Sequence, residues 1–171
     1  EKSLPKKELY EIASALKKLT TKYGAIFIVN DYVELAKAVG ANGVHLGQDD
    51  MPLKEARAIL GKSKIIGIST HTFQEALKAE AEGADYIGFG PIYTTKTKDA
   101  GDPKGCMALR ELKSLLNIPI VAIGGININN LREVVATGVD AVASISALLS
   151  GDNIKENIAT FLYYLEIYRK D

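Results

Sequence analysis

The sequence of 171 residues lacks most features that mark secreted, membrane or nucleic-acid-binding proteins. Its one cysteine, Cys106, excludes an intrachain disulfide, and it contains neither a pair of CxxC elements nor an HExxH motif for zinc. Its apolar runs are much shorter than the roughly 18 residues of a membrane span. The 21 Lys and Arg residues balance 21 Asp and Glu residues, so no net field favours nucleic acid or an anionic membrane. We therefore expect a cytoplasmic protein whose phosphate binding, if any, is local.

The composition that is present is that of one globular domain. Hydrophobic residues make up 47% of the chain and charged residues 25%, with 15 Gly and 5 Pro. This balance predicts a single core, and hence one domain over residues 1–171.

The apolar spacing alternates between the helical and the strand period. A first helix of about 16 residues includes Leu9 to Leu19, with Ser3 as its N-cap and Pro5 in its first turn. Further helices are predicted at 32–39, 52–60, 72–82, 106–116, 127–137 and 153–168. Strands are predicted at 25–30, 43–47, 64–69, 85–90, 119–124 and 140–145.

Local signals support these boundaries. Thr72 and Glu75 have the spacing of a capping box, and Gly40, Gly83 and Gly138 stand where helix C-caps are expected. Each of these glycines opens a short repeat, Gly-Ala-Asn, Gly-Ala-Asp or Gly-Val-Asp, that joins a helix to the next strand.

Strands that alternate with helices over short connections are parallel. Polar residues at successive strand ends favour a TIM (β/α)₈ barrel over an open doubly wound sheet. The predicted elements supply six of its eight strands, and the chain opens on a helix at Glu1 without an initiator Met. We therefore expect an N-terminally incomplete barrel that lacks its first βαβ portion.

Asp31 and Asp50 follow two neighbouring predicted strands, which lie about 4.8 Å apart in a sheet. Two carboxylates suit Mg²⁺, whose other ligands are water and substrate phosphate oxygens. The alternative is that Asp31 caps the helix at Tyr32, and that Asp49 or Asp50 caps the helix after Pro52.

The longest connection, 91–105, is polar in an otherwise tightly looped chain. The hydroxyls of Thr95 and Thr97 and the ammonium groups of Lys96 and Lys98 suit a phosphate, although a merely solvated loop is the alternative. Gly125 and a helix start at Ser146 complete a phosphate site of the kind found after the last barrel strands.

Other polar residues carry weaker signals. His45 lies within a strand, where a histidine satisfied in the core is the common case, although near the strand end it would touch a substrate ring. Ser69 and His71 lie two residues apart without a third orienting acid, so we expect them to bind a ligand by hydrogen bonds. Cys106 opens a helix, and we expect it to be a small buried apolar side chain.

Six motifs occur together and in order over nearly the whole chain. They are Asn30-Asp31, His45-Leu-Gly-Gln48-Asp-Asp50, Gly67-Ile-Ser69-x-His71, Gly90-Pro91-Ile-Tyr-x-Thr95-x-Thr97-Lys98, Ala122-Ile-Gly-Gly125-Ile and Ile145-Ser146. In this set the chain resembles the thiamine phosphate synthase family. The resemblance implies a (β/α)₈ transferase that joins a hydroxymethylpyrimidine diphosphate to a thiazole phosphate and releases diphosphate.

The resemblance also implies roles for single residues. Asp31 and Asp50 would hold Mg²⁺. The catalytic residues that contact the pyrimidine diphosphate would be Asn30, Ser69 and Lys98. The remaining substrate-binding residues would be Lys2, His45, Thr95, Lys96, Thr97, Gly125, Ile145 and Ser146. Small phosphorylated molecules would be the partners, with no nucleic acid or membrane, and a homo-oligomer is possible.

Two other functions fit parts of this pattern. A thiazole tautomerase relative shares the fold but transfers protons, and it needs no carboxylate pair for a diphosphate. A non-catalytic phosphate-binding remnant or assembly subunit would follow from loss of the first barrel units, because an open barrel exposes strand edges.

Overall fold

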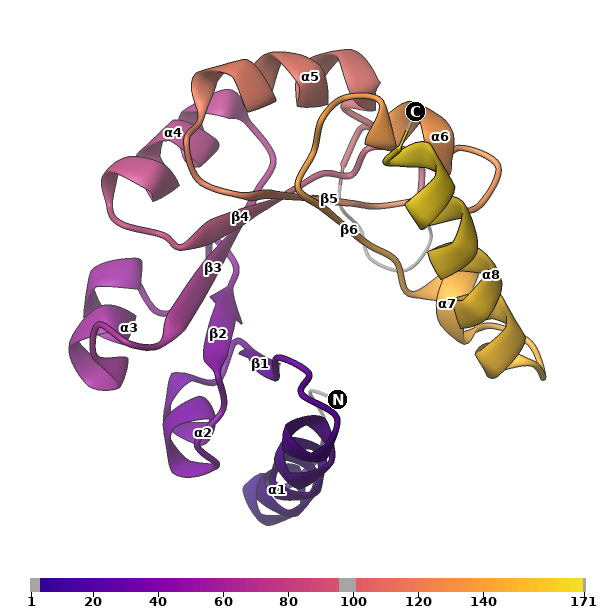
Figure 1. The fold of residues 1–171 in the computed structure, drawn as a ribbon. Coiled ribbons are helices and arrows are strands. Elements are labelled where there is room, and N and C mark those ends of the chain that lie inside the picture. The colour runs from indigo at the N-terminus through magenta and orange to yellow at the C-terminus, as the bar shows by residue number, and fades with distance from the viewer. Residues whose placement is uncertain (1–3, 96–100, 171) are drawn as a thin grey trace. The chain divides into compact units, whose positions relative to one another are not determined.

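The computed structural model describes residues 4–95 and 101–170, which alternate helices and strands (Figure 1). The chain divides into two compact units. The first consists of the chain up to Ser69 together with Glu82–Asp85. The second consists of Thr70–Ala81 and the chain from Tyr86 onward. Within the described residues, no helix is long and apolar enough to cross a membrane.

The first unit is built from three strand and helix pairs. Its elements are α1 (Lys6–Lys22), β1 (Ile28–Asn30), α2 (Val33–Ala38), β2 (Gly43–Leu46), α3 (Leu53–Leu60) and β3 (Ile65–Thr70), whose last residue belongs to the second unit. The strands pair in the order β1, β2, β3, and both pairs are parallel. The register places Asn30 beside His45 and His45 beside Gly67. All three strands therefore end at the same edge.

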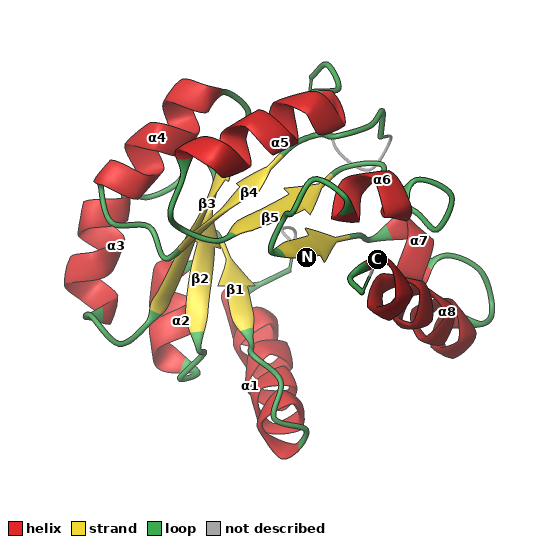
Figure 2. Ribbon diagram, turned by 45° about the horizontal axis from the view of Figure 1, so that its top comes forward, coloured by secondary structure: helices red, strands yellow, loops and turns green. Residues whose placement is uncertain are grey.

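The second unit repeats this arrangement (Figure 2). Its elements are α4 (Phe73–Ala81), β4 (Tyr86–Phe89), α5 (Gly105–Leu115), β5 (Ile120–Ile123), α6 (Leu131–Val135), β6 (Ala141–Ala143), α7 (Ser146–Leu149) and α8 (Ile154–Tyr168). The strands β4, β5 and β6 pair in that order and in parallel. Helix α4 packs against β4, and α8 packs against α6 and α7.

The core of each unit follows from the apolar strand residues. In the first unit Val44, Leu46 and Ile66 are fully buried, and in the second Ile87 and Ile120 are. Burial of these runs on both faces is typical of strands covered by helices. The described residues thus form the six parallel strands of the predicted α/β class.

Three predicted elements are about half as long as expected, and one of them is strand 140–145, which is reduced to β6. Strand 25–30 is reduced to β1, because the Ala25 N–H donates to the Thr20 carbonyl and so belongs to the end of α1. Helix 127–137 is reduced to α6, because the side chains of Asn127 and Asn130 accept backbone hydrogen bonds and hold residues 127–130 in turns. Ser3 lies outside the described residues, but α1 begins at Lys6 with Pro5 at the N-cap position, so the prediction of Ser3 as N-cap and Pro5 in the first turn was wrong.

The short repeat seen in the sequence serves one structural purpose in the described chain. Gly40, Gly83 and Gly138 all have positive φ, as helix-ending glycines do. Two residues later stands Asn42, Asp85 or Asp140, whose side-chain oxygen accepts the backbone N–H at the start of the preceding strand. These donors are Phe27, Ile66 and Ile120, at 3.0, 2.7 and 2.8 Å.

The same three side chains each accept from a cation on the helix before that strand. The cations are Lys17, Arg57 and Lys113, at 3.0, 2.6 and 2.7 Å. At the amino end of each of these strands, hydrogen bonds from one Asn or Asp side chain therefore connect the preceding helix, the strand and the junction that follows. The repeat is therefore a stabilising feature, located at the opposite edge from the predicted site.

Candidate functional site

Asp31 directly follows β1 and has an unusual backbone conformation. Its φ is 67°, a backbone angle that residues other than glycine adopt infrequently. Its backbone N–H donates to the His45 carbonyl at 2.9 Å. That bond continues the pairing of β1 with β2 by one residue and turns the chain at this point. Asp31 is half-buried, and the adjacent Asn30 is exposed.

Asp50 lies in the loop between β2 and α3. Its Oδ2 accepts the Gly47 N–H at 2.6 Å, and a Cβ on Gly47 would come within 3.0 Å of the same oxygen. The loop thus holds the carboxylate close against the Gly47 backbone. Within the described residues the N-caps of α2 and α3 are Tyr32 and Pro52, which make no side-chain capping bond, so neither aspartate occupies the N-cap position considered as the alternative.

Ser69 is held at the end of β3 by two side chains from the β2 strand and loop. Its Oγ lies 2.8 Å from His45 Nε2, and its carbonyl accepts from Gln48 Nε2 at 2.6 Å. His45 is half-buried and hydrogen-bonded, as a structural histidine would be, yet its partner is a predicted catalytic serine. The geometry makes His45 a residue that orients the Ser69 hydroxyl.

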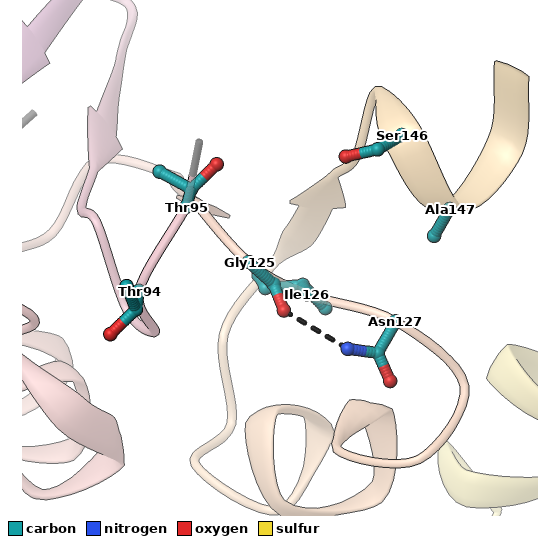
Figure 3. A pocket seen from close by; sticks show the side chains of 7 residues that line it. All are labelled: Thr94, Thr95, Gly125, Ile126, Asn127, Ser146 and Ala147. Carbon is teal, nitrogen blue, oxygen red and sulfur yellow. Dashed lines mark hydrogen bonds between the residues drawn. The ribbon is translucent and has the colours of Figure 1, made fainter. Parts of the chain in front are cut away.

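The second unit contains a pocket of about 580 Å³ at the ends of its strands (Figure 3). Its lining residues are Thr94, Thr95, Gly125, Ile126, Asn127, Ser146 and Ala147. In Figure 3 the hydroxyls of Thr95 and Ser146 point toward each other across the pocket, whereas the side chain of Thr94 points away. The predicted phosphate-binding residues Thr95, Gly125 and Ser146 are thus brought together.

A network of asparagines forms the turn at the floor of this pocket. The Gly125 carbonyl accepts from Asn127 Nδ2 at 3.2 Å and from Asn130 Nδ2 at 3.0 Å. Asn130 Oδ1 in turn accepts the Asn127 N–H at 2.8 Å. These bonds fix residues 125–130 in one conformation.

The same bonds determine the electrostatics of the pocket. The Gly124, Gly125 and Ile126 carbonyls all accept hydrogen bonds from protein donors, the first from Tyr93 N and the last from Ser144 Oγ. Carbonyl lone pairs repel a phosphate, and here they are engaged elsewhere. Thr95 and Ser146 place hydroxyl groups, which can donate to an anion, in the lining of the pocket.

Tyr93 and Cys106 meet beside the pocket. The Tyr93 hydroxyl lies 3.3 Å from Cys106 Sγ and 2.6 Å from Glu133 Oε2. Cys106 is half-buried and hydrogen-bonded, so the expectation of a merely apolar buried side chain was wrong. Desolvation raises the pKa of the Cys106 thiol above its ordinary value, and the Tyr93 hydrogen bond, which acts to lower it, does not compensate. The thiol is therefore not an activated nucleophile.

The other predicted residues are distributed as follows. Ile145 is the N-cap of α7 and is exposed. The His71 ring is anchored through Nδ1, which is hydrogen-bonded to the Gly90 carbonyl at 2.7 Å, and its role toward a ligand stays a prediction. Thr72 Oγ1 accepts the backbone N–H of Glu75, as the predicted capping box requires. The Glu75 carboxylate, however, accepts the backbone N–H of His71 and not that of Thr72. Lys2, Lys96, Thr97 and Lys98 lie outside the described residues, and their roles stay predictions.

Sequence reasoning missed the pairing of His45 with Ser69 and the asparagine floor. The run Gly-Gly-Ile-Asn-Ile-Asn-Asn was the available signal for the second, because asparagine side chains favour turns over helix. For the first, the signal was that both residues stand at or near the end of a predicted strand. Their diagonal contact required the register of β2 against β3.

Known proteins of one family are similar to this chain over most of its length. The family model for thiamine monophosphate synthase matches residues 1–148. The thiamine-phosphate synthase of Shouchella clausii is 48% identical over 167 residues, which are 97% of this chain and 80% of that protein. The thiamine-phosphate synthase of Pyrococcus horikoshii is 47% identical over 154 residues, 90% of this chain and 74% of that protein.

A solved structure agrees as well. The thiamine phosphate pyrophosphorylase of Pyrococcus furiosus superposes with a TM-score of 0.91 at 41% identity, covering 98% of this chain and 81% of that one. The family match and these identities confirm the resemblance that the six motifs indicated. This chain belongs to the thiamine monophosphate synthase family, a family of transferase enzymes.

Proposed function

We propose that this chain synthesises thiamine phosphate from a hydroxymethylpyrimidine diphosphate and a thiazole phosphate, releasing diphosphate. The observation that carries the proposal is the pocket lined by Thr95, Gly125 and Ser146, since a family member needs a site for a phosphate monoester. The pocket wall contains side-chain hydroxyl groups, and its Gly125 and Ile126 carbonyls accept hydrogen bonds from the protein.

In the first unit, Asp31 and Asp50 fit Mg²⁺. Both supply carboxylate oxygens, the ligand type that Mg²⁺ prefers, and Gly47 leaves the space in which the Asp50 carboxylate sits. When bound, the ion would neutralise charge on the leaving diphosphate. Asn30 and the Ser69 hydroxyl, oriented by His45, are the groups that we assign to the pyrimidine diphosphate.

In the second unit, Thr95 and Ser146 donate to the phosphate of the thiazole, and Gly125 allows its close approach. We assign Ile145 to the same substrate, since it precedes Ser146 at the start of α7. Lys2, Lys96, Thr97 and Lys98 remain predicted ligands of the two phosphorylated substrates.

The reaction needs no strong general base. The C–O bond between the pyrimidine methylene and the diphosphate breaks, and the electron pair leaves with the diphosphate. The electron-rich aminopyrimidine stabilises the resulting cation, and the thiazole nitrogen forms the new C–N bond. The protein positions both partners and stabilises developing phosphate charge, which explains a site rich in anion ligands and poor in acid–base pairs.

Three broader proposals follow. The six strands belong to a (β/α)₈ barrel, supported by the TM-score of 0.91 to a solved member of the family. The protein acts in the cytoplasm, as the single cysteine suggests. We also retain the prediction that it can form a homo-oligomer.

The test is synthesis of thiamine phosphate from the two substrates in the presence of Mg²⁺, and the reaction is monitored by the release of diphosphate. Asp50→Ala should lower kcat/KM by about 100-fold or more, because the leaving group loses its counter-ion. Asp49→Ala is the matched control, since Asp49 is the exposed neighbour in the same loop, and it should retain wild-type rates. Equal rates in the two variants would remove the metal assignment.

The two alternatives are resolved by the same preparation. Thiazole isomerisation without diphosphate release would identify a tautomerase. Phosphate binding without either reaction would identify a non-catalytic relative. Only product formation with stoichiometric diphosphate supports the synthase.

A further inference from the structure

We infer that Tyr93 is a positioning residue for the phosphate pocket, acting through its hydroxyl bonds to α5 and α6 to hold Thr95 beside Gly125. The inference rests on the proposed function, because it assigns the pocket to the thiazole phosphate. Tyr93 does not line the pocket and is given no contact with substrate.

The first observation is the close packing of residues 92–94 against the glycine pair. Tyr93 N donates to the Gly124 carbonyl at 3.0 Å, and Ile92 N donates to the Ile123 carbonyl at 2.9 Å. A Cβ on Gly125 would lie 2.6 Å from the Thr94 carbonyl oxygen and 2.8 Å from Tyr93 Cβ. The place of Thr95 relative to Gly125 therefore depends on where Tyr93 sits.

The second observation is how the Tyr93 side chain is anchored. Its hydroxyl donates to Glu133 Oε2 on α6 at 2.6 Å, and this bond uses its one hydrogen. Cys106 Sγ, in the first turn of α5, lies 3.3 Å from the same Tyr93 oxygen, within hydrogen-bonding distance for sulfur. One side chain thus connects the residues before Thr95 to two helices.

The third observation is that this anchor persists across the assay range of pH. Desolvation, followed by the hydrogen bonds to Cys106 and Glu133, raises the pKa of Tyr93 well above its usual value. The hydroxyl is therefore a donor at neutral and moderately alkaline pH. A short bond from a neutral donor to a carboxylate is among the stronger hydrogen bonds in a protein.

Loss of the Tyr93 hydroxyl should affect recognition of the phosphate group of the thiazole and not recognition of the other substrate. Removing the Tyr93 hydroxyl loosens Thr95 against Gly125, so contacts to the thiazole phosphate weaken. The contacts of Asn30 and Ser69 with the pyrimidine diphosphate, which we assign to the first unit, are unaffected. A thiazole alcohol without the phosphate makes no use of the pocket and should not sense the change.

The test compares Tyr93→Phe with Tyr163→Phe, an exposed tyrosine on α8 that controls for loss of a hydroxyl. In Tyr93→Phe the KM for thiazole phosphate should rise about tenfold. The KM for the pyrimidine diphosphate and kcat/KM for the thiazole alcohol should stay within about twofold of wild type. General loss of structure would instead lower activity on the phosphate and the alcohol together.

Variants of the acceptor complete the test. Glu133→Gln keeps an oxygen acceptor, so its KM for thiazole phosphate should stay close to that of wild type. Glu133→Ala should raise this KM as much as Tyr93→Phe does. The double variant Tyr93→Phe/Glu133→Ala should show little further increase, because both substitutions remove the same hydrogen bond. An unchanged KM for thiazole phosphate in Tyr93→Phe, or a parallel loss with the alcohol, would overturn the inference.

Calorimetric binding of thiazole phosphate to the same variants gives a second readout that needs no turnover. Affinity weakened about tenfold in Tyr93→Phe alone supports the inference, and equal affinities in all variants refute it. Absence of synthesis by the wild type would refute the proposed function and leave the binding comparison to decide the role of Tyr93.

Discussion

Asp140 differs from Asn42 at the equivalent junction in carrying a charge. Desolvation acts to raise the pKa of Asp140, but the hydrogen bonds from Lys113 and from the Ile120 N–H outweigh it and hold the pKa below its ordinary value. A carboxyl with a lowered folded-state pKa stabilises the fold above its unfolded-state pKa, about 3.9. That contribution is lost as the pH falls through the folded-state value.

Asp140→Asn should therefore lower the free energy of unfolding at neutral pH and flatten its decline in acid. The amide oxygen can still accept the Ile120 N–H, so the effect reports the charge facing Lys113. Urea unfolding followed by circular dichroism between about pH 3 and about pH 7 measures both quantities.

Asn42→Asp is the converse variant. It places a carboxylate opposite Lys17, whose ammonium lies 3.0 Å from the Asn42 oxygen, and should steepen the acid decline. Identical pH slopes for wild type and both variants would show that the cation at these junctions contributes nothing to folding stability.

The residues that the sequence could identify are those whose position along the chain decides their place. Asp31 and Asp50 follow strands of the first unit and Ser146 follows a strand of the second, and the order of elements alone predicted that each stands beyond a strand end. His45 and Tyr93 could not be assigned in this way. Each acts through a side-chain contact that depends on register or on helix placement, and neither is encoded by spacing.

At the scale of elements, strands and helices were predictable because their apolar periods are undisturbed. One exception lies where side-chain hydrogen bonds compete with the backbone, in residues 127–130. Asn127 and Asn130 replace the first turns of a predicted helix with the pocket floor. Helix α6 is thus shorter than its apolar period predicts, and this departure lies at the candidate site, where departures from local propensity are expected.

Gly125 and Gly24 allow the role of one turn to be measured. Both have a φ of 66°, but a Cβ on Gly24 meets nothing within 4 Å, whereas one on Gly125 lies 2.6 Å from the Thr94 carbonyl oxygen. Gly24→Ala should cost about 1 kcal/mol of folding free energy from the backbone conformation alone. Gly125→Ala should cost about 1–3 kcal/mol more, because the Cβ displaces Thr94.

Chemical unfolding measures the two costs, and calorimetry with thiazole phosphate measures the consequence for the pocket. Binding should be lost in Gly125→Ala and kept in Gly24→Ala. Equal stabilities and equal affinities in the two variants would show that close packing of residues 93–94 on Gly125 does not shape the site.

At the scale of the whole molecule, positive and negative side chains are equal in number, and we assign the two substrates to different units of the chain. With 21 positive and 21 negative side chains, no overall field gathers the two anionic substrates. Each must be recognised by its own group of residues. The proposed magnesium and diphosphate ligands Asp31, Asp50 and Ser69 fall in the first unit, and Thr95, Gly125 and Ser146 fall in the second.

This division predicts that the two ligands act separably on thermal stability. A ligand at 100 times its Kd stabilises the folded state by about 2.7 kcal/mol, or about 5–10 °C in Tm for a chain of this size. Magnesium diphosphate should raise the Tm of wild type and Ser146→Ala but not of Asp50→Asn. Thiazole phosphate should raise the Tm of wild type and Asp50→Asn but not of Ser146→Ala. Diphosphate without magnesium is the control, and it should have little effect on any variant. If instead each substitution abolished both shifts, recognition would belong to one shared group of residues, and the assignment of one ligand to each unit would be wrong.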